Sequence, residues 1–347
     1  MNFFDLHCDT ACRLYKENLT LDNDLLAVTP EKASAFEKWY QCFAIFVKDG
    51  TQNPFEFYKA VLSRFKEQSV CNAQNLEPII TVEGGLLVEK DLNRVEALYN
   101  DGVRALTLTW NGENQIAGGA DTDAGLKDFG CEVIRKLNKF GIAVDLSHLN
   151  KKSFYDALEL AERPIVTHSC LEFVHKHKRN IDDGQLKLLV QKNGVFGLCF
   201  YPEFLGDGDV FENVYKNIFH ILDMGYEDYL SIGSDFDGAD MSDKLYDISY
   251  IPALYEFLKY KNIHIMTYMP ALLVAYIRCK YMNKVDIITI LLFGMITFSV
   301  YYCASSTSMV AYTLFLIYIL MYNKINKLKW MNVRNYFILF IAIFVFI

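Results

Sequence analysis

The chain has 347 residues, of which 52% are hydrophobic, and a formal net charge of −8. The segment from Lys261 to the C-terminus holds eight basic residues and one acidic residue, which leaves −15 on residues 1–260. Such an acidic body offers no basic face for phosphates, so we expect no nucleic-acid partner. The nine cysteines are odd in number and form no C-x-x-C pair, which argues against a disulfide framework and indicates reduced thiols of a cytosolic protein.

Eight short apolar runs recur along residues 1–260. Each run is nearly continuous rather than alternating, as is typical of parallel strands buried on both faces. The expected strands are Asn2–Asp9, Tyr40–Val47, Pro78–Glu83, Val103–Thr109, Ile142–Ser147, Pro164–His168, Gly194–Phe200 and Tyr229–Asp235.

Stretches of helical period separate these runs. The expected helices include Asp91–Tyr99, Lys127–Phe140, Asp182–Gln191, Glu212–Met224 and, after the eighth strand, Ile251–Tyr260. Strand–helix alternation repeated eight times in about 250 residues predicts an α/β protein with a closed (β/α)8 barrel of the TIM type. The alternative is an open doubly wound sheet, but no G-x-G-x-x-G follows the first strand.

The last part of the sequence is strongly apolar and aromatic. Val285–Ala304 is long enough to span a bilayer, whereas Met309–Tyr322 and Asn335–Ile347 are shorter. We therefore expect a barrel domain over 1–260 and a hydrophobic helical tail with transmembrane helices over 261–347. Basic clusters at 278–284 and 324–334 favour a hairpin with both ends in the cytoplasm, which leaves the barrel there too. The alternative is that the tail is not a native part of the protein, in which case the protein is cytoplasmic.

The first expected strand ends in His7-Cys8-Asp9. Residues two apart on a strand face the same side, so His7 and Asp9 project together at the end of the barrel that carries active sites. An imidazole beside a carboxylate makes half of a metal site. This pair alone is a weak signal, because it occurs often by chance.

Four more residues that can bind metal stand where other expected strands end. They are Glu83, His148, His168 and Asp235. Three histidines with two or three carboxylates exceed the needs of one tetrahedral zinc with an open position. They suit two metal ions about 3.5–4 Å apart that share a carboxylate and a hydroxide, which predicts amide hydrolysis without a covalent intermediate. A hydrogen-bonded core role is the alternative for His148 and His168 taken singly.

These motifs resemble the membrane dipeptidase (renal dipeptidase) family of zinc peptidases over about residues 1–260. The resemblance implies two Zn²⁺ ions, with His7 and Asp9 on the first, Glu83 bridging, and His148 and His168 on the second. It implies that Arg179 holds the carboxylate of the dipeptide substrate and that Asp235 shuttles the proton to the leaving amine. The family often dimerises, so a homodimer is implied as well.

Some residues leave alternatives open. Trp110 stands where the family usually has a histidine that helps to stabilise the intermediate. Asn111 and Asn114 are candidates for the hydrogen-bond donor that this histidine would supply. Asp237 competes with Asp235 for the role of functional acid. Cys170, two residues past His168, is a further candidate for a minor ligand role.

The expected function is zinc-dependent hydrolysis of the peptide bond of dipeptides through a metal-bridged hydroxide. One alternative is another binuclear amidohydrolase reaction, on N-acyl amino acids, lactones or deamination substrates. Another is an inactive truncated relic that carries a membrane tail, because the family pattern is lost after about Tyr260.

Overall fold

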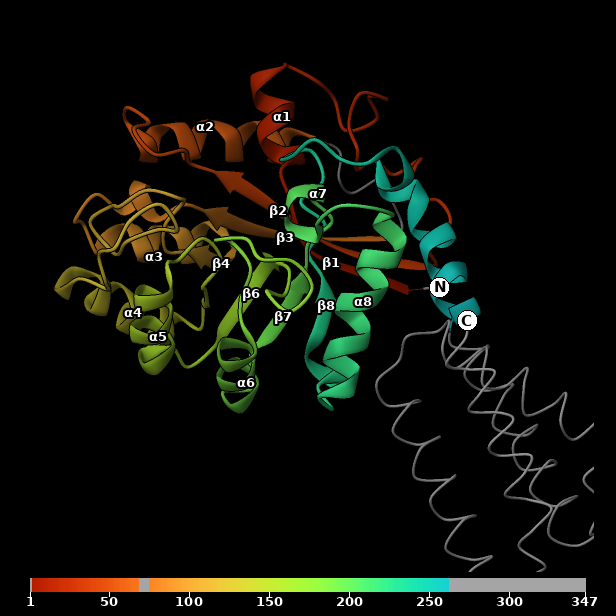
Figure 1. The fold of residues 1–347 in the computed structure, drawn as a ribbon. Coiled ribbons are helices and arrows are strands. Elements are labelled where there is room, and N and C mark those ends of the chain that lie inside the picture. Colours follow the sequence, from red (N-terminus) through yellow and green to blue (C-terminus); the bar gives the residue numbers. More distant parts are fainter. Residues whose placement is uncertain (1, 69–74, 262–347) are drawn as a thin grey trace, which may run out of the picture. The chain divides into compact units, whose positions relative to one another are not determined.

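The computed structural model of the protein describes residues 2–68 and 75–261, and their strands form a closed barrel (Figure 1). Neighbouring strands pair in parallel in chain order, and β8 closes the ring against β1. The strands are β1 (Asn2–Cys8), β2 (Lys38–Phe46), β3 (Leu76–Glu83), β4 (Val103–Thr107), β5 (Ala143–Asp145), β6 (Pro164–Ser169), β7 (Val195–Leu198) and β8 (Leu230–Ile232). The predicted barrel is confirmed, and the open doubly wound sheet is wrong.

Helices follow the strands and cover the outside of the barrel (Figure 1). They are α1 (Thr10–Lys16), α2 (Pro54–Glu67), α3 (Asn93–Asp101), α4 (Asp128–Phe140), α5 (Lys151–Leu160), α6 (Asp183–Gln191), α7 (Pro202–Leu205) and α8 (Val210–Asp223), and residues 251–261 are also helical. Short 3₁₀ turns are η2 (Gly85–Val88), η3 (Glu227–Tyr229), η4 (Asp243–Leu245) and η5 (Ile248–Tyr250). The five predicted helices are present, and their ends differ from the predicted ends by at most two residues.

Helix α4 illustrates how the sequence sets these helices on the barrel. Val133, Ile134 and Leu137 are fully buried and lie on one helical face, which packs inward. The helix ends at Gly141, whose left-handed backbone (φ 69°) is the usual C-terminal cap. Helix α6 instead begins with a capping box, in which Asp182 and Gln185 accept from each other's backbone N–H groups.

Six strands end one to three residues earlier than the apolar runs predict, and for β5 and β8 the difference concerns residues of the barrel rim. β5 ends at Asp145 and β8 at Ile232, whereas the runs continue to Ser147 and Asp235. His148 and Asp235 have left-handed backbones, with φ of 68° and 65°. Because that conformation turns the chain out of the strand ladder, both side chains sit on turns just past the strands.

The predicted tail, 261–347, lies outside the described residues except for Lys261. Its membrane-spanning helices and its native origin therefore stay predictions. Within the ranges 2–68 and 75–261, none of the helices combines the length and the apolar character that a membrane crossing requires.

Candidate metal centre

Six residues predicted from the strand ends gather at one rim of the barrel. His7, Glu83 and His168 lie on β1, β3 and β6, and Asp9, His148 and Asp235 follow β1, β5 and β8. All six belong to groups whose potential ligand atoms lie within 4.8 Å of one another. The groups are His7–Asp9–Glu83, Glu83–His148–His168 and His7–His168–Asp235.

Glu83 lies between two sides of this cluster. Its Oε2 is 3.3 Å from Nε2 of His7, and its Oε1 is 2.8 Å from Nε2 of His148. On the first side, Nε2 of His7 is also 3.4 Å from Asp9 Oδ2. On the second side, the Nε2 atoms of His148 and His168 are 2.9 Å apart. One carboxylate thus presents one oxygen to each side, which is the arrangement that two ions with a shared ligand require.

Two glycines permit the close approach of these side chains. A Cβ atom on Gly84, which has φ 93°, would lie 2.5 Å from the carbonyl oxygen of Val47. A Cβ atom on Gly238 would lie 2.2 Å from Asp9 Oδ2 and 2.6 Å from Asp235 Oδ1. Side chains at these two positions would displace the strand end or the carboxylates themselves.

The hydrogen bonds of the two histidines on the second side leave lone pairs facing inward. Nδ1 of His148 is 2.8 Å from Oδ1 of Asn111, which can only accept, so this Nδ1 carries the proton. Nδ1 of His168 is 2.9 Å from the Thr167 hydroxyl, which donates its own proton to Asp145. Both Nε2 atoms therefore present lone pairs beside the Glu83 carboxylate.

A donor set of this kind fits a cation. Nε2 of His7 and Oδ1 of Asp9 are buried and have no hydrogen-bond partner among the described residues. Neutral imidazoles and carboxylates are the ligands that zinc and related ions take from proteins. The residues present therefore suit a metal centre.

Charge and burial set the protonation of the cluster. Burial lowers the pKa of His7, but the carboxylates of Asp9 and Glu83 outweigh it and raise this pKa well above its usual value. Burial, with the Arg179 guanidinium nearby, lowers the pKa of His148 to about 4. Burial also raises the pKa of Asp235 to about 8. The carboxylates on the first side thus need positive charge, which either a proton on His7 or a bound cation supplies.

Arg179 stands beside the second side of the cluster, on the loop between β6 and α6. Its side chain is 5% exposed, its Nη2 donates to Nε2 of His168 over 3.0 Å, and its guanidinium packs 5.2 Å from the ring centre of Phe204. Its Nε has no hydrogen-bond partner within the described ranges. The residue predicted to bind a carboxylate is therefore next to the metal-ligand candidates.

A cleft of about 980 Å³ opens over the cluster. Asp9, Glu83, His148, His168, Arg179 and Asp235 all line it. Trp110 and Phe46 form part of its wall, with ring centres 5.3 Å apart. The volume suits a small molecule of the size of a dipeptide.

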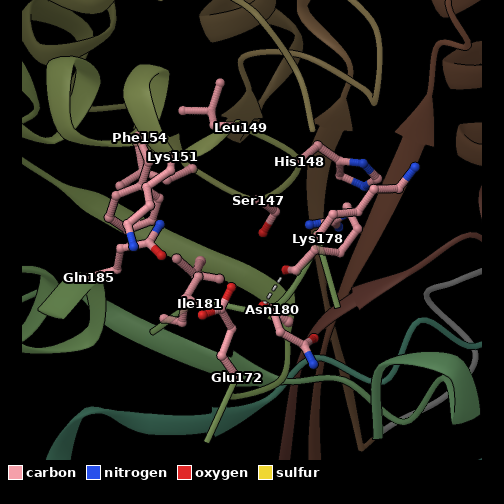
Figure 2. A pocket seen from close by; sticks show the side chains of 14 residues that line it. Ser147, His148, Leu149, Lys151, Phe154, Glu172, Lys178, Asn180, Ile181 and Gln185 are labelled. Carbon is pink, nitrogen blue, oxygen red and sulfur yellow. Dashed lines mark hydrogen bonds between the residues drawn. The ribbon is translucent and has the colours of Figure 1, made fainter. Parts of the chain in front are cut away.

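A smaller cavity of about 50 Å³ lies at the ends of β5 and β6. Figure 2 shows His148 and Lys178 on one side of it and Phe154 and Gln185 on the other. His148, Lys178 and Arg179 line both this cavity and the cleft, so they lie between the two spaces.

Hydrogen bonds distinguish the residues for which the sequence left alternatives open. Asp237 accepts from Thr10, Arg13 and the backbone of Ala27, so it braces the rim and leaves Asp235 as the acid in the cluster. The thiol of Cys170 donates to the carbonyl oxygen of Cys199 and belongs to none of the candidate groups.

Asn114 is not available as a donor in the cleft. Its Nδ2 donates to the carbonyl oxygen of Leu108, and its Oδ1 accepts from the backbones of Ile116 and Ala117. Asn111 does line the cleft, but its Oδ1 faces His148.

Two buried aspartates that the strand-end pattern did not indicate lie below the rim. Asp5 accepts from the backbones of His7 and Ser234 and from the side chains of Ser234 and Gln41. Asp145 accepts from the backbones of Ser147 and Thr167 and from the hydroxyls of Thr107 and Thr167. The sequence feature that could have located these two residues is a carboxylate within an apolar strand run, because a buried charge needs hydrogen-bond donors around it.

A sequence profile of the family described as membrane dipeptidase (peptidase family M19) matches residues 60–267, more than half of the chain. The chain belongs to this family. The resemblance seen in the motifs is confirmed, and the family's dependence on metal agrees with the ligand groups at the rim.

Several known proteins match parts of the chain. An uncharacterised dipeptidase of Schizosaccharomyces pombe is 34% identical over 185 residues, which cover 50% of this chain and 44% of the relative. A second S. pombe dipeptidase is 30% identical over 55% of this chain and 49% of its own length. A Klebsiella pneumoniae protein described as uncharacterised, in the pqqA 5′ region, is 30% identical over 58% of this chain and 78% of that protein. The chain thus spans about half the length of the two S. pombe relatives.

Solved structures share the fold. The dipeptidase AC, a metallopeptidase of family M19, aligns with TM-score 0.68 and 23% identity over 75% of this chain and 91% of its own. A metallopeptidase from Rhodobacter sphaeroides, liganded with a phosphinate mimic of L-Ala-D-Ala, aligns with TM-score 0.67 and 22% identity over 75% and 92%. At these identities the likeness supports the barrel alone.

Proposed function

We propose that this protein is a zinc-dependent dipeptidase that holds two Zn²⁺ ions bridged by Glu83. The observation that carries the proposal is the position of Glu83, with one oxygen toward His7 and the other toward His148. His7 and Asp9 would hold the first ion, and His148 and His168 the second. When bound, the ions would supply an acidified water as nucleophile and would polarise the scissile carbonyl.

Arg179 is proposed to bind the free carboxylate of the substrate. Its guanidinium offers a planar fork of donors that matches a carboxylate, and it is buried beside His168 at the edge of the cleft. A substrate held at one end by Arg179 has its peptide bond directed toward the metal ligands, which restricts cleavage to short peptides with a free C-terminus.

Asp235 is proposed to carry the proton from the attacking water to the leaving amine. Its carboxylate lines the cleft, and its Oδ1 is 3.8 Å from Nε2 of His7. A carboxyl group whose pKa burial raises to about 8 can both accept and return a proton near neutral pH.

The test is hydrolysis of a panel of dipeptides by the full chain in mild detergent, with zinc and with a chelator. The panel includes D-residues at the second position, because the R. sphaeroides neighbour was liganded with a mimic of L-Ala-D-Ala. We expect turnover that the chelator abolishes. No turnover with two zinc ions bound would overturn the dipeptidase proposal in favour of another amide or ester substrate, and absence of metal binding would support the relic.

Arg179→Met separates a dipeptidase from an enzyme for neutral amides. We expect kcat/KM for dipeptides to fall roughly 10- to 100-fold while neutral amide or lactone substrates are spared, because a charge-assisted hydrogen bond contributes about 1.5–3 kcal/mol. Lys176→Met, an exposed residue on the same loop, is the matched control and should leave kcat/KM unchanged. Equal losses on both substrate classes would contradict the role given to Arg179.

Membrane association through residues 261–347, with the barrel in the cytoplasm, and a homodimer are further proposals that rest on the sequence and the resemblance. Fractionation of cells with an alkaline wash tests the anchor, since an inserted tail keeps the protein in the pellet. Light scattering of the detergent-solubilised chain measures the assembly.

A further inference from the structure

We propose that Asn111 is a positioning residue that holds the His148 ring with Nε2 toward Glu83, and so tunes the second metal site. This inference rests on the proposed function, since it assigns a residue to the support of one of its ligands. Asn111 would not touch the metal or the substrate in this role.

The decisive contact is the 2.8 Å hydrogen bond between Asn111 Oδ1 and Nδ1 of His148. Because the amide oxygen only accepts, Nδ1 is the protonated nitrogen and Nε2 keeps its lone pair. That Nε2 lies 2.8 Å from Glu83 Oε1. Hydrogen bonds to the second nitrogen of a metal-binding histidine fix its tautomer and its orientation.

The ring contacts of His148 do not select its orientation by themselves. Its neighbours are the rings of Trp110, at 6.3 Å between centres, and His168, at 4.9 Å. Rotating the imidazole by 180° about the bond to Cβ keeps its shape but exchanges Nδ1 with a carbon. A hydrogen bond distinguishes the two orientations, whereas packing against flat rings does so only weakly.

Backbone hydrogen bonds of the loop between β4 and α4 hold Asn111 beside His148. The backbone N–H of Ala120 donates to the carbonyl oxygen of His148 over 2.8 Å, and that of Asp121 donates to the carbonyl oxygen of Asn111, also over 2.8 Å. Two consecutive residues thus fix both members of the pair. A Cβ atom on Gly119 would lie 2.2 Å from the carbonyl oxygen of Trp110, so this return of the loop requires glycine.

The fold of this loop does not depend on the Asn111 side chain. Asn114 bonds three backbone groups within the loop, and the backbone bonds of Ala120 and Asp121 join it to its neighbours. The Asn111 amide is therefore free to serve His148, and its removal should affect the ring more than the loop.

The experiment compares Asn111→Leu, which keeps the shape but removes the acceptor, with Asn111→Asp, which keeps an oxygen acceptor. Zinc affinity is measured by competition with a chromophoric chelator. We expect Asn111→Leu to weaken one of the two zinc sites about 10- to 100-fold and Asn111→Asp to restore it. Glu113→Gln, whose side chain is 47% exposed in the same loop, is the matched control and should bind as the unmodified protein does.

A second readout needs neither metal nor activity. In the metal-free protein labelled with ¹⁵N in its histidine rings, the His148 signals, assigned by their loss in a His148→Gln variant, should report protonated Nδ1. In Asn111→Leu they should shift to a mixture of tautomers, while the thermal unfolding temperature stays near that of the unmodified protein.

The outcomes separate the two proposals. If the unmodified protein binds zinc and Asn111→Leu binds it equally well at both sites, the role of Asn111 is overturned and the dipeptidase proposal stands. If the unmodified protein binds no zinc, the proposed function fails, and the ring spectra still decide whether Asn111 sets the tautomer of His148.

Discussion

The two sides of the metal-centre rim rest on different buried carboxylates. Asp5 lies under the first side and Asp145 under the second, and each accepts two backbone N–H groups and two side-chain donors. From Asp5 the hydrogen bonds continue through Ser234 to the backbones of His7 and Phe236 and through Gln41 to the Trp39 ring, and within the described residues they reach no imidazole. From Asp145 the hydrogen bonds continue through the Thr167 hydroxyl to Nδ1 of His168. The first carboxylate holds the backbone, and the second also orients an imidazole.

This difference predicts that Asp5 acts on stability alone, whereas Asp145 acts on stability and on the ligand properties of His168. The distinction depends on what lies one hydrogen bond beyond the acid. The following substitutions test it, from the largest expected effect to the smallest.

Glu83→Gln should have the largest effect, because both sides of the rim share this carboxylate. We expect turnover to fall on the order of 10³-fold or more, together with a lower zinc content per chain, since Lewis-acid catalysis contributes several kcal/mol. Steady-state kinetics and elemental analysis measure the two effects. Glu77→Gln, at the other end of β3 with a side chain that is 58% exposed, is the control. Full zinc content and full activity in Glu83→Gln would refute a shared ligand.

Asp145→Asn and Asp5→Asn should lower the free energy of unfolding alike, each by about 1.5–3 kcal/mol, because each disturbs hydrogen bonds to a buried charge. Only Asp145→Asn should also weaken zinc binding, by about 10- to 100-fold. An amide nitrogen at residue 145 would donate to Thr167, whose hydroxyl would then donate to Nδ1 of His168. That reversal places the ring proton on Nε2, where it blocks the ligand lone pair.

Urea denaturation and chelator competition measure these two quantities for both variants. Equal loss of zinc affinity in Asp5→Asn and Asp145→Asn would erase the proposed difference between the two sides of the rim.

Thr167→Val should have a smaller effect than Asp145→Asn, because it removes one hydroxyl and leaves Asp145 charged. We expect the free energy of unfolding to fall by about 1 kcal/mol and zinc affinity by about tenfold. Thr81→Val is the matched control, since the Thr81 hydroxyl is buried on β3 without a hydrogen-bond partner in the described part of the chain. It should unfold at the same or a higher temperature in calorimetry. A drop in zinc affinity for Thr81→Val as large as that for Thr167→Val would show that the effect does not depend on the hydrogen bonds that join Asp145 to His168.

Much of the barrel could be predicted because buried parallel strands produce continuous apolar runs. The runs located β1 to β8, and the common edge of parallel strands explained why His7, Glu83 and His168 should meet. The metal roles of these residues remain predictions, although their proximity is now described.

What the sequence did not predict depends on turns and on contacts between distant loops. The left-handed backbones at His148 and Asp235 interrupt the apolar runs at positions that the run pattern did not indicate. The pairing of Asn111 with His148 joins residues 37 apart through the return of the loop at Gly119. Likewise, Asp237 bonds to Thr10 and Arg13 while Asp235 joins the ligand cluster, and no local pattern indicates this difference.

The left-handed turns at His148 and Asp235 also bear on how this protein responds to selection. A residue with a Cβ atom in that conformation costs about 1–3 kcal/mol, whereas glycine adopts it freely. A screen that rewards heat resistance without substrate would therefore favour glycine at both positions and discard an imidazole and a carboxylate from the rim. Directed evolution of this protein needs turnover as a second criterion, because the residues that favour stability at these two positions differ from those that the proposed activity requires.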